Sequence, residues 1–545
     1  MEGRIPPEKR VRERPTAELR TEPGATEELL QRTRELRERM RPGRAQGPGT
    51  RRGRLPTAAW VCFWVALLNG IAWGLIVPLF QTPDEPGHVA YVQHVAESGK
   101  PPPGGSELQH FSQEQRRLLD AIRWKAVQRK ADDRVPGTSS FHKRVERDVD
   151  TRADRLSEGG YTTDINNPPF YYFVAAGVYH LSPWTSLPDR IHAVRLLSAL
   201  LAAITVLFVF LFLRELIPST PWAWTVGALA VAFQPMFGFT SSGVTSDAVL
   251  YAASAGIFYT FALSFRRGLT PRRGMAIGGL AAVGLLSKLN MIGLAPGIGV
   301  GLLVLMLRAD GGHRRQAIRG ALVAFVVVAV PVAAYMLLNS TVWDRGIWFG
   351  NAGVPPLTGI PVPNPSGEPQ TASVKLLDGA EYMWQFYLPR LPSMSPLFPA
   401  YPLRHIWFNG FIGQFGWLEY GFPHWVYDVA LAMALGLVAL VGRELIRVRE
   451  VLRSRIWELV TYLLLVFGLL VLVAATSYEA RIGGATGYEQ PRYLLPLMAL
   501  YGALVAIGAR GAGKRWGPAA GVLFVCIAIA HTAAAMILTL TRFYG

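Results

Sequence analysis

A short segment near the start of the apolar sequence places two adjacent carboxylates beside a histidine. It runs over residues 82–88, Thr-Pro-Asp-Glu-Pro-Gly-His, and directly follows the first long apolar run, 57–80. Ionisable groups are costly close to hydrocarbon, and those kept at membrane depth usually serve a function. Asp84, Glu85 and His88 are therefore candidates for acid–base chemistry at a membrane surface. A solvated cap on the following helix is the alternative interpretation.

Three later ionisable residues also stand at the ends of apolar runs. Asp247 follows Ser246 at the start of one run, where helix capping alone would explain it equally well. Lys288 interrupts the apolar sequence, where it would either snorkel to the headgroups or supply a point charge for a phosphate. Arg492 enters the next run and would bind a phosphate through paired hydrogen bonds.

The apolar runs predict an all-α polytopic membrane protein. Half of the 545 residues are apolar and 17% are charged. Runs of about 20 apolar residues recur, which is the length that a helix needs to cross a bilayer. The predicted spans, about eleven by this criterion, are 57–80, 191–213, 222–240, 247–265, 274–289, 290–307, 320–338, 424–442, 457–475, 492–509 and 517–541.

Basic residues in the short connections predict the orientation. Arginines gather in four connections, and the positive-inside rule places all of them in the cytoplasm together with the arginine-rich N-terminus: 266–273, 308–319, 443–455 and 510–515. The alternate connections, including the two large loops 81–190 and 339–423, then lie outside the membrane. The net charge of +17 is therefore mostly a signal of orientation and requires no nucleic acid partner.

The apolar segment 168–181 is the ambiguous one, because its length of about 14 residues is too short for a full crossing. If it were a span, the arginine-rich connections that follow it would all lie outside. We therefore predict an interfacial or re-entrant helix on the outer side, anchored by Tyr171, Tyr172 and Tyr179.

We expect two parts in the chain. Residues 1–54 combine charged residues with Pro and Gly, which predicts a disordered basic tail in the cytoplasm, and residues 55–545 form the polytopic membrane domain. Within it, loop 81–190 is expected to fold as a cap of helices on the membrane. In loop 339–423, the segment that begins at Asn409 is rich in Gly and aromatic residues. It would either hold a sugar or lipid headgroup or form an aromatic interface belt.

Seven short motifs occur in a characteristic order along the chain: Pro83-Asp-Glu-Pro-Gly-His88, Asn167-Pro-Pro-Phe-Tyr-Tyr172, Arg195-Leu-Leu-Ser-Ala-Leu-Leu201, Ser246-Asp-Ala248, Lys288, Phe415-Gly-Trp-Leu418 and Arg492-Tyr-Leu-Leu-Pro496. This order resembles the DUF2142 family of bacterial membrane proteins of unknown function, which is similar to the GT-C glycosyltransferases. The resemblance covers roughly residues 56–510.

The resemblance implies a GT-C-like fold and a polyprenyl-phosphate sugar as the donor. Asp84 would be the general base for an acceptor hydroxyl, or would hold a divalent metal ion if this branch uses one. Glu85 would orient the acceptor or the metal. Lys288 and Arg492 would neutralise the donor phosphate as it leaves. The complete set of residues expected to bind substrate is His88, Asn167, Asp247, Lys288, Arg492 and Tyr493.

These features predict a multi-pass plasma-membrane protein with a cytoplasmic N-terminus and an extracytoplasmic active site. It would transfer a sugar to an envelope glycan, lipid or protein. The sequence contains no Walker A, CxxC, GxSxG or HExxH motif. Two alternatives stay open. A transporter or flippase would place polar groups near mid-span and show inverted repeats, and neither is visible. A non-catalytic envelope assembly protein would tolerate the loss of Asp84.

Overall fold

The long apolar runs form helices, because a helix satisfies its own backbone hydrogen bonds where water is absent. The structure is a computed structural model, and the ranges that it describes all belong to one compact unit, Leu55–Gly545. They are 55–103, 111–130, 132–135, 154–156, 159–160, 165–181, 186–343, 345, 372–394, 403–482 and 489–545. The predicted tail, residues 1–54, lies outside the described residues, as do parts of both large loops.

Nine helices within these ranges are long and apolar enough to cross a membrane. They are α2 (Thr57–Ile76), α9 (Leu187–Leu216), α12 (Asp247–Arg267), η1 with α14 (Leu289–Leu294 and Ala295–Leu307), α15 (Gly311–Thr341), α18 (His424–Arg447), α20 (Ile456–Ile482), η3 with α21 (Pro491–Leu497 and Met498–Gly511) and α22 (Gly513–Tyr544). The chain is thus a multi-pass, all-helical membrane protein, as predicted.

The other two predicted spans are helical but shorter. Segment 222–240 divides into α10 (Pro221–Ala232) and α11 (Pro235–Thr240). Pro235 causes the break, because proline has no N–H to continue a helix and disfavours the helical conformation of the residue before it. The side chain of Gln234 then caps α11 by accepting a hydrogen bond from the Phe237 N–H at 2.6 Å. The other segment forms α13 (Pro271–Leu285), a helix of 15 residues.

Short elements complete the described chain. The helices are α3 (Glu85–Ser98), α4 (Gln113–Ala121), α5 (Trp124–Val127), α8 (Phe170–His180), α16 (Ala372–Tyr387), η2 (Arg404–Asn409), α17 (Gly410–Gly413) and α19 (Arg449–Ser454). Two strands of two residues each, β1 (Gln414–Phe415) and β2 (Tyr420–Gly421), form an antiparallel hairpin with Gln414 opposite Gly421. The aromatic segment that begins at Asn409 therefore contains this hairpin.

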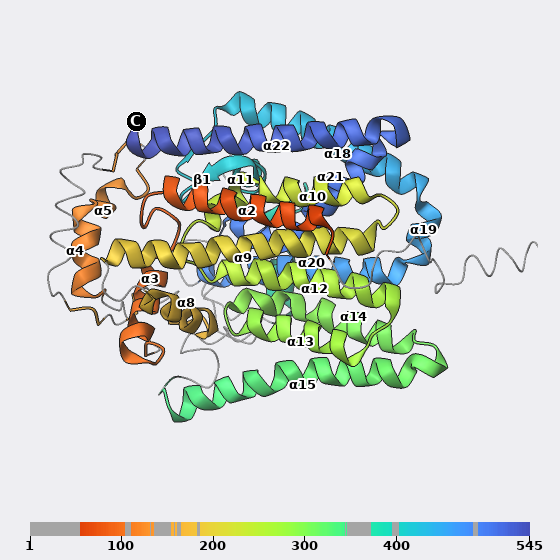
Figure 1. The fold of residues 1–545 in the computed structure, drawn as a ribbon, viewed down its shortest axis with the longest axis horizontal. Coiled ribbons are helices and arrows are strands. Elements are labelled where there is room, and N and C mark those ends of the chain that lie inside the picture. The colour runs from red at the N-terminus through yellow and green to blue at the C-terminus, as the bar shows by residue number, and fades with distance from the viewer. Residues whose placement is uncertain are drawn as a thin grey trace, which may run out of the picture. The chain divides into compact units, whose positions relative to one another are not determined.

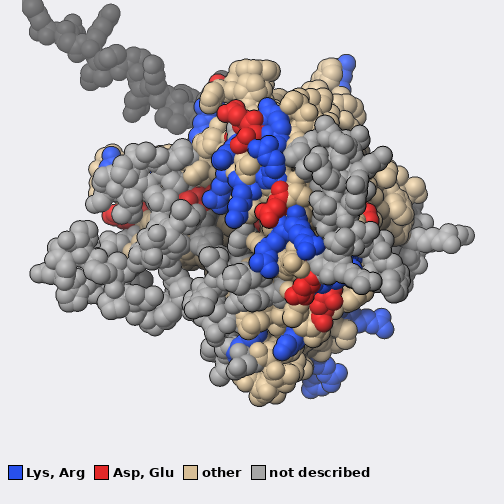
Figure 2. Space-filling view, turned by 90° about the vertical axis from the view of Figure 1, so that its left-hand side faces the viewer, with Lys and Arg blue, Asp and Glu red and all other residues tan. Residues whose placement is uncertain are grey.

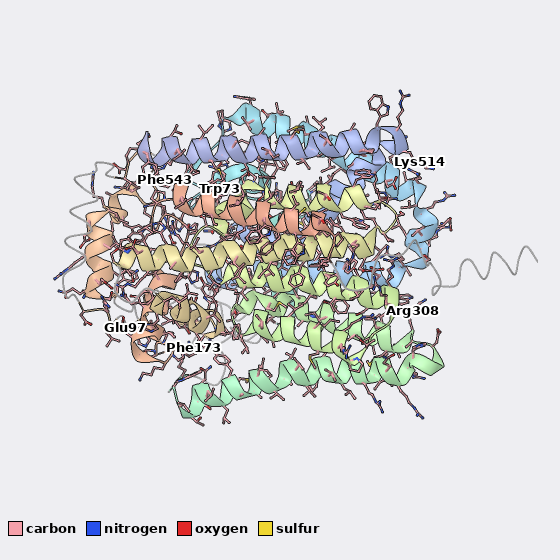
Figure 3. The ribbon with its side chains drawn as sticks, viewed as in Figure 1. Trp73, Glu97, Phe173, Arg308, Lys514 and Phe543 are labelled. Atoms are coloured by element: carbon pink, nitrogen blue, oxygen red, sulfur yellow. The ribbon has the colours of Figure 1, made fainter. Side chains whose placement is uncertain are left out.

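The long helices run side by side, with different short elements at their two ends (Figure 1). We call the end that carries α3, α4, α5 and α8 the cap end. Glu97 and Phe173 lie there, whereas Arg308 and Lys514 lie at the opposite end (Figure 3). Helix α8 has 11 residues and packs against α3 and α9, so that it stays at the cap end without crossing the bundle.

The four arginine-rich connections meet at the end opposite the cap, which we call the arginine end. Arg266 and Arg267 both donate to the buried carboxylate of Glu215, at 3.0 and 2.7 Å. Arg510 pairs with the buried Glu444 at 3.0 Å. Each acidic side chain is buried and paired, as expected for a charge removed from water. The arginine-rich connections therefore lie together at one end of the bundle, as the basic residues predicted.

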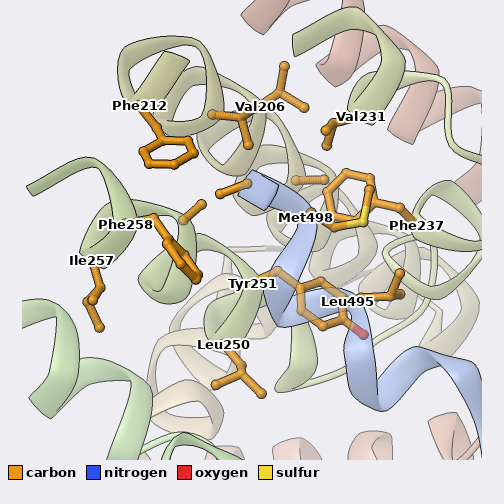
Figure 4. Packing of buried hydrophobic residues seen from close by; sticks show 14 of the residues in the cluster. Val206, Phe212, Val231, Phe237, Leu250, Tyr251, Ile257, Phe258, Leu495 and Met498 are labelled. Carbon is orange, nitrogen blue, oxygen red and sulfur yellow. The ribbon is translucent and has the colours of Figure 1, made fainter. Parts of the chain in front are cut away.

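The hydrophobic core fixes the elements that carry the site. Tyr251 of α12 packs beside Leu495 of η3 and Met498 of α21 (Figure 4). The Tyr251 hydroxyl also donates to the backbone carbonyl of Arg492 at 3.4 Å. Close helix packing continues away from the cap end, where a Cβ atom on Gly227 of α10 would collide with the carbonyl of Gly502 in α21.

Candidate functional site

The turn between α2 and α3 has an unusual backbone. Phe80 and Asp84 both adopt left-handed conformations, each with φ of 64°. This region is uncommon for residues other than glycine, and such conformations persist only where the surrounding structure holds them in place. Trp124 of α5 supports the turn by donating its indole N–H to the Phe80 carbonyl at 3.0 Å. The turn presents Asp84 at the N-cap position of α3.

Glu85 and Arg195 lock this turn to α9. Arg195 donates two hydrogen bonds to the Glu85 carboxylate, at 2.7 and 2.6 Å. The same carboxylate accepts from the N–H groups of Phe80 and Val244, at 2.8 and 3.0 Å. Arg195 also donates to three carbonyl groups at the end of α2 and beyond it, those of Gly74, Val77 and Pro78. Both side chains are buried, and Glu85 has no exposed surface.

Asp84 and Arg492 form the pair that faces outward from this turn. An Arg492 Nη2 hydrogen bond joins the two side chains, and Nη1 donates to the carbonyl of Pro83 at 3.3 Å. Arg492 is only 5% exposed, whereas the Asp84 side chain is 35% exposed. The guanidinium lies over the ring of Tyr493, 5.2 Å from its centre. The carboxylate is therefore the accessible half of the pair.

Asp247 and Lys288 form a second ion pair close by. The Lys288 Nζ atom lies 3.2 Å from Oδ1 of Asp247, and both side chains are nearly buried. The other carboxylate oxygen of Asp247 has no hydrogen-bond partner within the described residues, and the same holds for Nε of Arg492. A buried polar atom without a partner costs free energy. These two atoms are therefore buried hydrogen-bonding groups that the described residues leave unsatisfied.

His88 is buried next to the two ion pairs and contacts Tyr172, which forms with Tyr91 a stacked pair that we call the tyrosine layer. Its Nδ1 atom is 2.8 Å from the Tyr172 hydroxyl. Tyr172 stacks on Tyr91 with the ring centres 3.6 Å apart. Asn167 contacts the hydroxyl groups of both tyrosines: its side-chain amide lies 3.5 Å from the Tyr172 hydroxyl, and its backbone carbonyl accepts from the Tyr91 hydroxyl at 3.2 Å. His88 and Asn167 thus sit in the wall of the site.

The charges of the site interact with one another. Burial alone would raise the pKa of Asp84, but the positive charge of Arg492 and its hydrogen bond outweigh burial and lower the pKa below its usual value. Burial lowers the pKa of His88 to about 3, and the nearby Lys288 contributes in the same direction. At neutral pH the site therefore combines an ionised Asp84 with a neutral imidazole.

Acidic and basic side chains also lie side by side on the surface of the cap end (Figure 2). The eight predicted site residues all come from elements at or near this end. The structure joins Asp84 to Arg492 and Tyr493, Asp247 to Lys288, and His88 to the tyrosine layer that Asn167 contacts. Glu85 is adjacent in sequence but faces Arg195 instead.

A divalent ion held by Asp84 and Glu85 together does not fit this arrangement. All available directions of the Glu85 carboxylate are used by Arg195 and two backbone N–H groups. Across the part of the chain that the structure describes, no three His, Cys, Asp or Glu side chains are grouped so as to hold a metal. An ion held by Asp84 without Glu85, which the resemblance also allows, stays a prediction.

Two residues that shape the site, Arg195 and Tyr172, were not among the predicted site residues, and Tyr172 was expected only to anchor the interfacial helix. A single arginine inside a long apolar run is a detectable signal, because a charge there needs a partner. Tyr172 gave a weaker signal, since a tyrosine at a membrane interface needs no further explanation.

The family model for "Predicted membrane protein (DUF2142)" matches residues 63–501, which is most of the chain. The chain belongs to the DUF2142 family. No curated protein matches this family member.

Solved structures similar to this DUF2142 protein include two kinds of glycosyltransferase. One is the apo oligosaccharyltransferase of Archaeoglobus fulgidus, with 13% identity and a TM-score of 0.42 over 89% of this chain and 56% of that one. The archaeal enzyme AglB of the same organism, in complex with an inhibitory peptide and a dolichol-phosphate, has 14% identity and a TM-score of 0.41, covering 89% and 55%.

The second kind is the protein O-mannosyltransferase Pmt1–Pmt2 complex of S. cerevisiae, bound to the sugar donor. It has 14% identity and a TM-score of 0.33, covering 52% of this chain and 33% of that one. The DUF2142 chain thus spans between a third and just over half of the length of these enzymes. At these scores the likeness carries no argument about activity, which must come from the site.

Proposed function

We propose that this protein is a glycosyltransferase that moves a sugar from a polyprenyl-phosphate donor to a cell-envelope acceptor. The main support is the accessible carboxylate of Asp84, held by the buried Arg492 at the cap end. The positive-inside rule puts the opposite, arginine end in the cytoplasm of the plasma membrane, together with the N-terminus. The site then lies at the outer headgroups, where the phosphate and sugar of a polyprenyl donor also lie.

In the proposed reaction, an acceptor hydroxyl attacks the anomeric carbon of the sugar. The new bond joins the acceptor oxygen to this carbon, while the bond from the carbon to the phosphate oxygen breaks and both electrons leave with the polyprenyl phosphate. Asp84 takes the proton of the hydroxyl. Arg492 and Lys288 stabilise the negative charge that develops on the leaving phosphate.

Donor binding would also make Asp84 a better base. In the free protein, Arg492 stabilises the ionised form of Asp84 and lowers its pKa. A donor phosphate would compete for the same guanidinium, because arginine forms strong, often bidentate hydrogen bonds with phosphate oxygens. As this charge is shared with the phosphate, the pKa of Asp84 would rise towards its usual range, which favours proton transfer.

The remaining residues would then position the reacting groups. Glu85 and Arg195 hold the turn that presents Asp84, so we assign Glu85 a positioning role and not a contact with substrate. Asp247 orients Lys288, and its second oxygen is available to a sugar hydroxyl. His88, Asn167 and Tyr493 line the wall around them.

The test is lipid mass spectrometry on cells that lack the protein. We expect a polyprenyl-phosphate sugar to accumulate in the deletion strain and wild-type protein to clear it. Asp84→Asn should fail to clear it despite normal amounts in the membrane. Glu97→Gln is the matched control, because Glu97 is an exposed carboxylate on the same helix. If Asp84→Asn clears the lipid fully, the proposed catalysis is wrong and a role in assembly or transport takes its place.

A further inference from the structure

A second cavity lies between η2 and the first turn of α18, at the end of α18 opposite the arginine end. Its volume is about 510 Å3, which falls within the range of small-ligand sites. Leu403 lines it together with six residues that carry polar groups: Arg404, His405, Asn409, His424, Tyr427 and Asp428. We call it the η2–α18 cavity. None of the residues assigned to the reaction above lies in it.

Asn409 gives this cavity an unused hydrogen-bond acceptor. The residue is only 7% exposed. Its carbonyl oxygen Oδ1 has no partner among the residues that the structure describes. Buried carboxamides are normally hydrogen-bonded, and an unmet acceptor costs about 1–3 kcal/mol. A ligand that brings a hydrogen-bond donor to Asn409 would recover this loss.

The charges of the cavity favour hydroxyl groups over phosphate. Arg404 already forms an ion pair with Asp428 across the opening. A phosphate would have to compete with this carboxylate and would be repelled by it. Sugar hydroxyls both donate and accept hydrogen bonds, and so match the carboxylate, the carboxamide of Asn409 and the imidazoles of His405 and His424.

The neighbouring surface of α18 suits the apolar part of a lipid. Trp425, Val429 and Met433 are 66%, 49% and 46% exposed. Their spacing of four residues puts them on one face of the helix, in a stripe that begins at the cavity. Tryptophan is also enriched at the level of the lipid headgroups. A lipid whose head occupies the cavity would therefore lay its chains along this stripe.

Two contacts relate the cavity to the small pocket beside Arg492. Tyr427 lines the cavity and donates its hydroxyl to the side chain of Gln414 at 2.9 Å. Gln414 in turn lines a small pocket together with Pro83 and Arg492. The Tyr427–Gln414 contact thus separates the two spaces, and a headgroup bound in the cavity lies one side-chain contact away from the pocket that Arg492 lines.

We propose that the η2–α18 cavity binds the hydroxyl-rich headgroup of a glycolipid, which serves as the acceptor of the sugar. The binding follows from the cavity itself, whereas the role as acceptor rests on the proposed function. The segment that begins at Asn409 then contributes to sugar recognition and does not act only as an aromatic interface belt.

The test measures lipid binding to the full-length protein, purified in a non-glycosidic detergent and placed in phosphatidylglycerol nanodiscs that contain some monoglucosyl diacylglycerol. Native mass spectrometry counts the bound glucolipid. Asn409→Leu and Asp428→Asn should each lower its occupancy by roughly tenfold, as expected for the loss of about one hydrogen bond to a buried or charged group.

Glu450→Gln is the matched control, because Glu450 belongs to an equally exposed arginine pair at the arginine end. Unchanged glucolipid binding in both cavity variants would overturn the proposal. Phosphatidylglycerol that occupies the same place, with the same sensitivity to Asp428→Asn, would also overturn it. Glucolipid that binds in the cavity but accepts no sugar from an active enzyme would overturn the acceptor role alone, whereas inactivity towards every acceptor would count against the proposed function.

Discussion

Asp84 and Arg492 are separated by 408 positions in the sequence, yet their side chains form an ion pair at the junction of α3 and η3. Asp84 follows α2, and Arg492 lies in η3, which leads into α21. The pair therefore depends on the packing of the whole membrane domain. Its neighbours Glu85 and Arg195 form a second pair that is fully buried. Asp84 is partly exposed and is expected to contact the substrate, whereas Glu85 is buried and is expected to position the turn.

Glu85→Gln should destabilise the protein much more than Asp84→Asn. Removing the charge of Glu85 leaves Arg195 buried without its counter-ion, which typically costs about 3–5 kcal/mol. Asp84 is partly exposed, so that its substitution should cost less. Thermal unfolding of the purified variants measures the difference. Equal melting temperatures for the two variants would contradict the positioning role of Glu85.

Asp247 and Lys288 should show strong energetic coupling. Asp247→Asn or Lys288→Met alone removes one charge of this nearly buried ion pair, whereas the double variant removes both charges. We expect the double variant to be more stable than the sum of the single effects predicts, with a coupling energy of about 1–3 kcal/mol. A double-mutant cycle of unfolding free energies measures it. Additive effects would show that the pair contributes little.

Acidification should destabilise the protein through His88. The folded state keeps the pKa of His88 at about 3, because burial and then Lys288 disfavour its charged form. In the unfolded chain the usual pKa is about 6.5. Unfolding therefore takes up a proton as the pH falls below 6.5, and the stability present at higher pH is progressively lost. Between pH 7 and pH 5 this amounts to about 2 kcal/mol.

His88→Gln removes this contribution, so the melting temperature of the variant should fall less than that of the wild type over the same pH interval. The other groups that face His88, including Asp84, Asp247 and Arg492, are present in both proteins. Comparing the two slopes therefore isolates the histidine. Parallel curves would show that His88 takes up no extra proton on unfolding.

Arg542 should protect the cap against proteolysis. This residue near the end of α22 donates hydrogen bonds to three cap carbonyls, those of Val127, Lys130 and Asp133. Arg542→Gln should loosen this segment and accelerate tryptic cleavage after Arg129 and Lys130. Arg515→Gln, at the other end of the same helix, is the control. We call these three hydrogen bonds the Arg542 clamp, and equal cleavage rates in the two variants would show that it does not protect the cap.

The periodic and compositional signals in the sequence predicted most of the helical fold. Nine of the predicted spans are helices long and apolar enough to cross a membrane, and the arginine-rich connections meet at one end as the basic residues indicated. The division of the segment 222–240 was not predicted, although Pro235 marks it. Apolar composition alone does not distinguish one crossing helix from two shorter ones, because the break depends on local backbone hydrogen bonding.

The candidate site was predictable in its residue types but not in its pairings. Asp84, Asp247, Lys288 and Arg492 stand out as charges beside apolar runs. Which cation faces which carboxylate depends on packing between distant helices. The sequence therefore could not reveal that Glu85 is enclosed by Arg195 while Asp84 stays accessible. The role of each carboxylate in the reaction stays a prediction.

The order in which the chain is synthesised gives the Arg542 clamp a further consequence. Asp84 and the cap leave the ribosome early, whereas Arg492 and Arg542 come from the last helices. A nascent chain that still lacks these helices has no counter-ion for Asp84 and no anchor for the cap. The completed site is therefore a property of the finished, fully inserted chain, and a truncated product would reach the membrane without it.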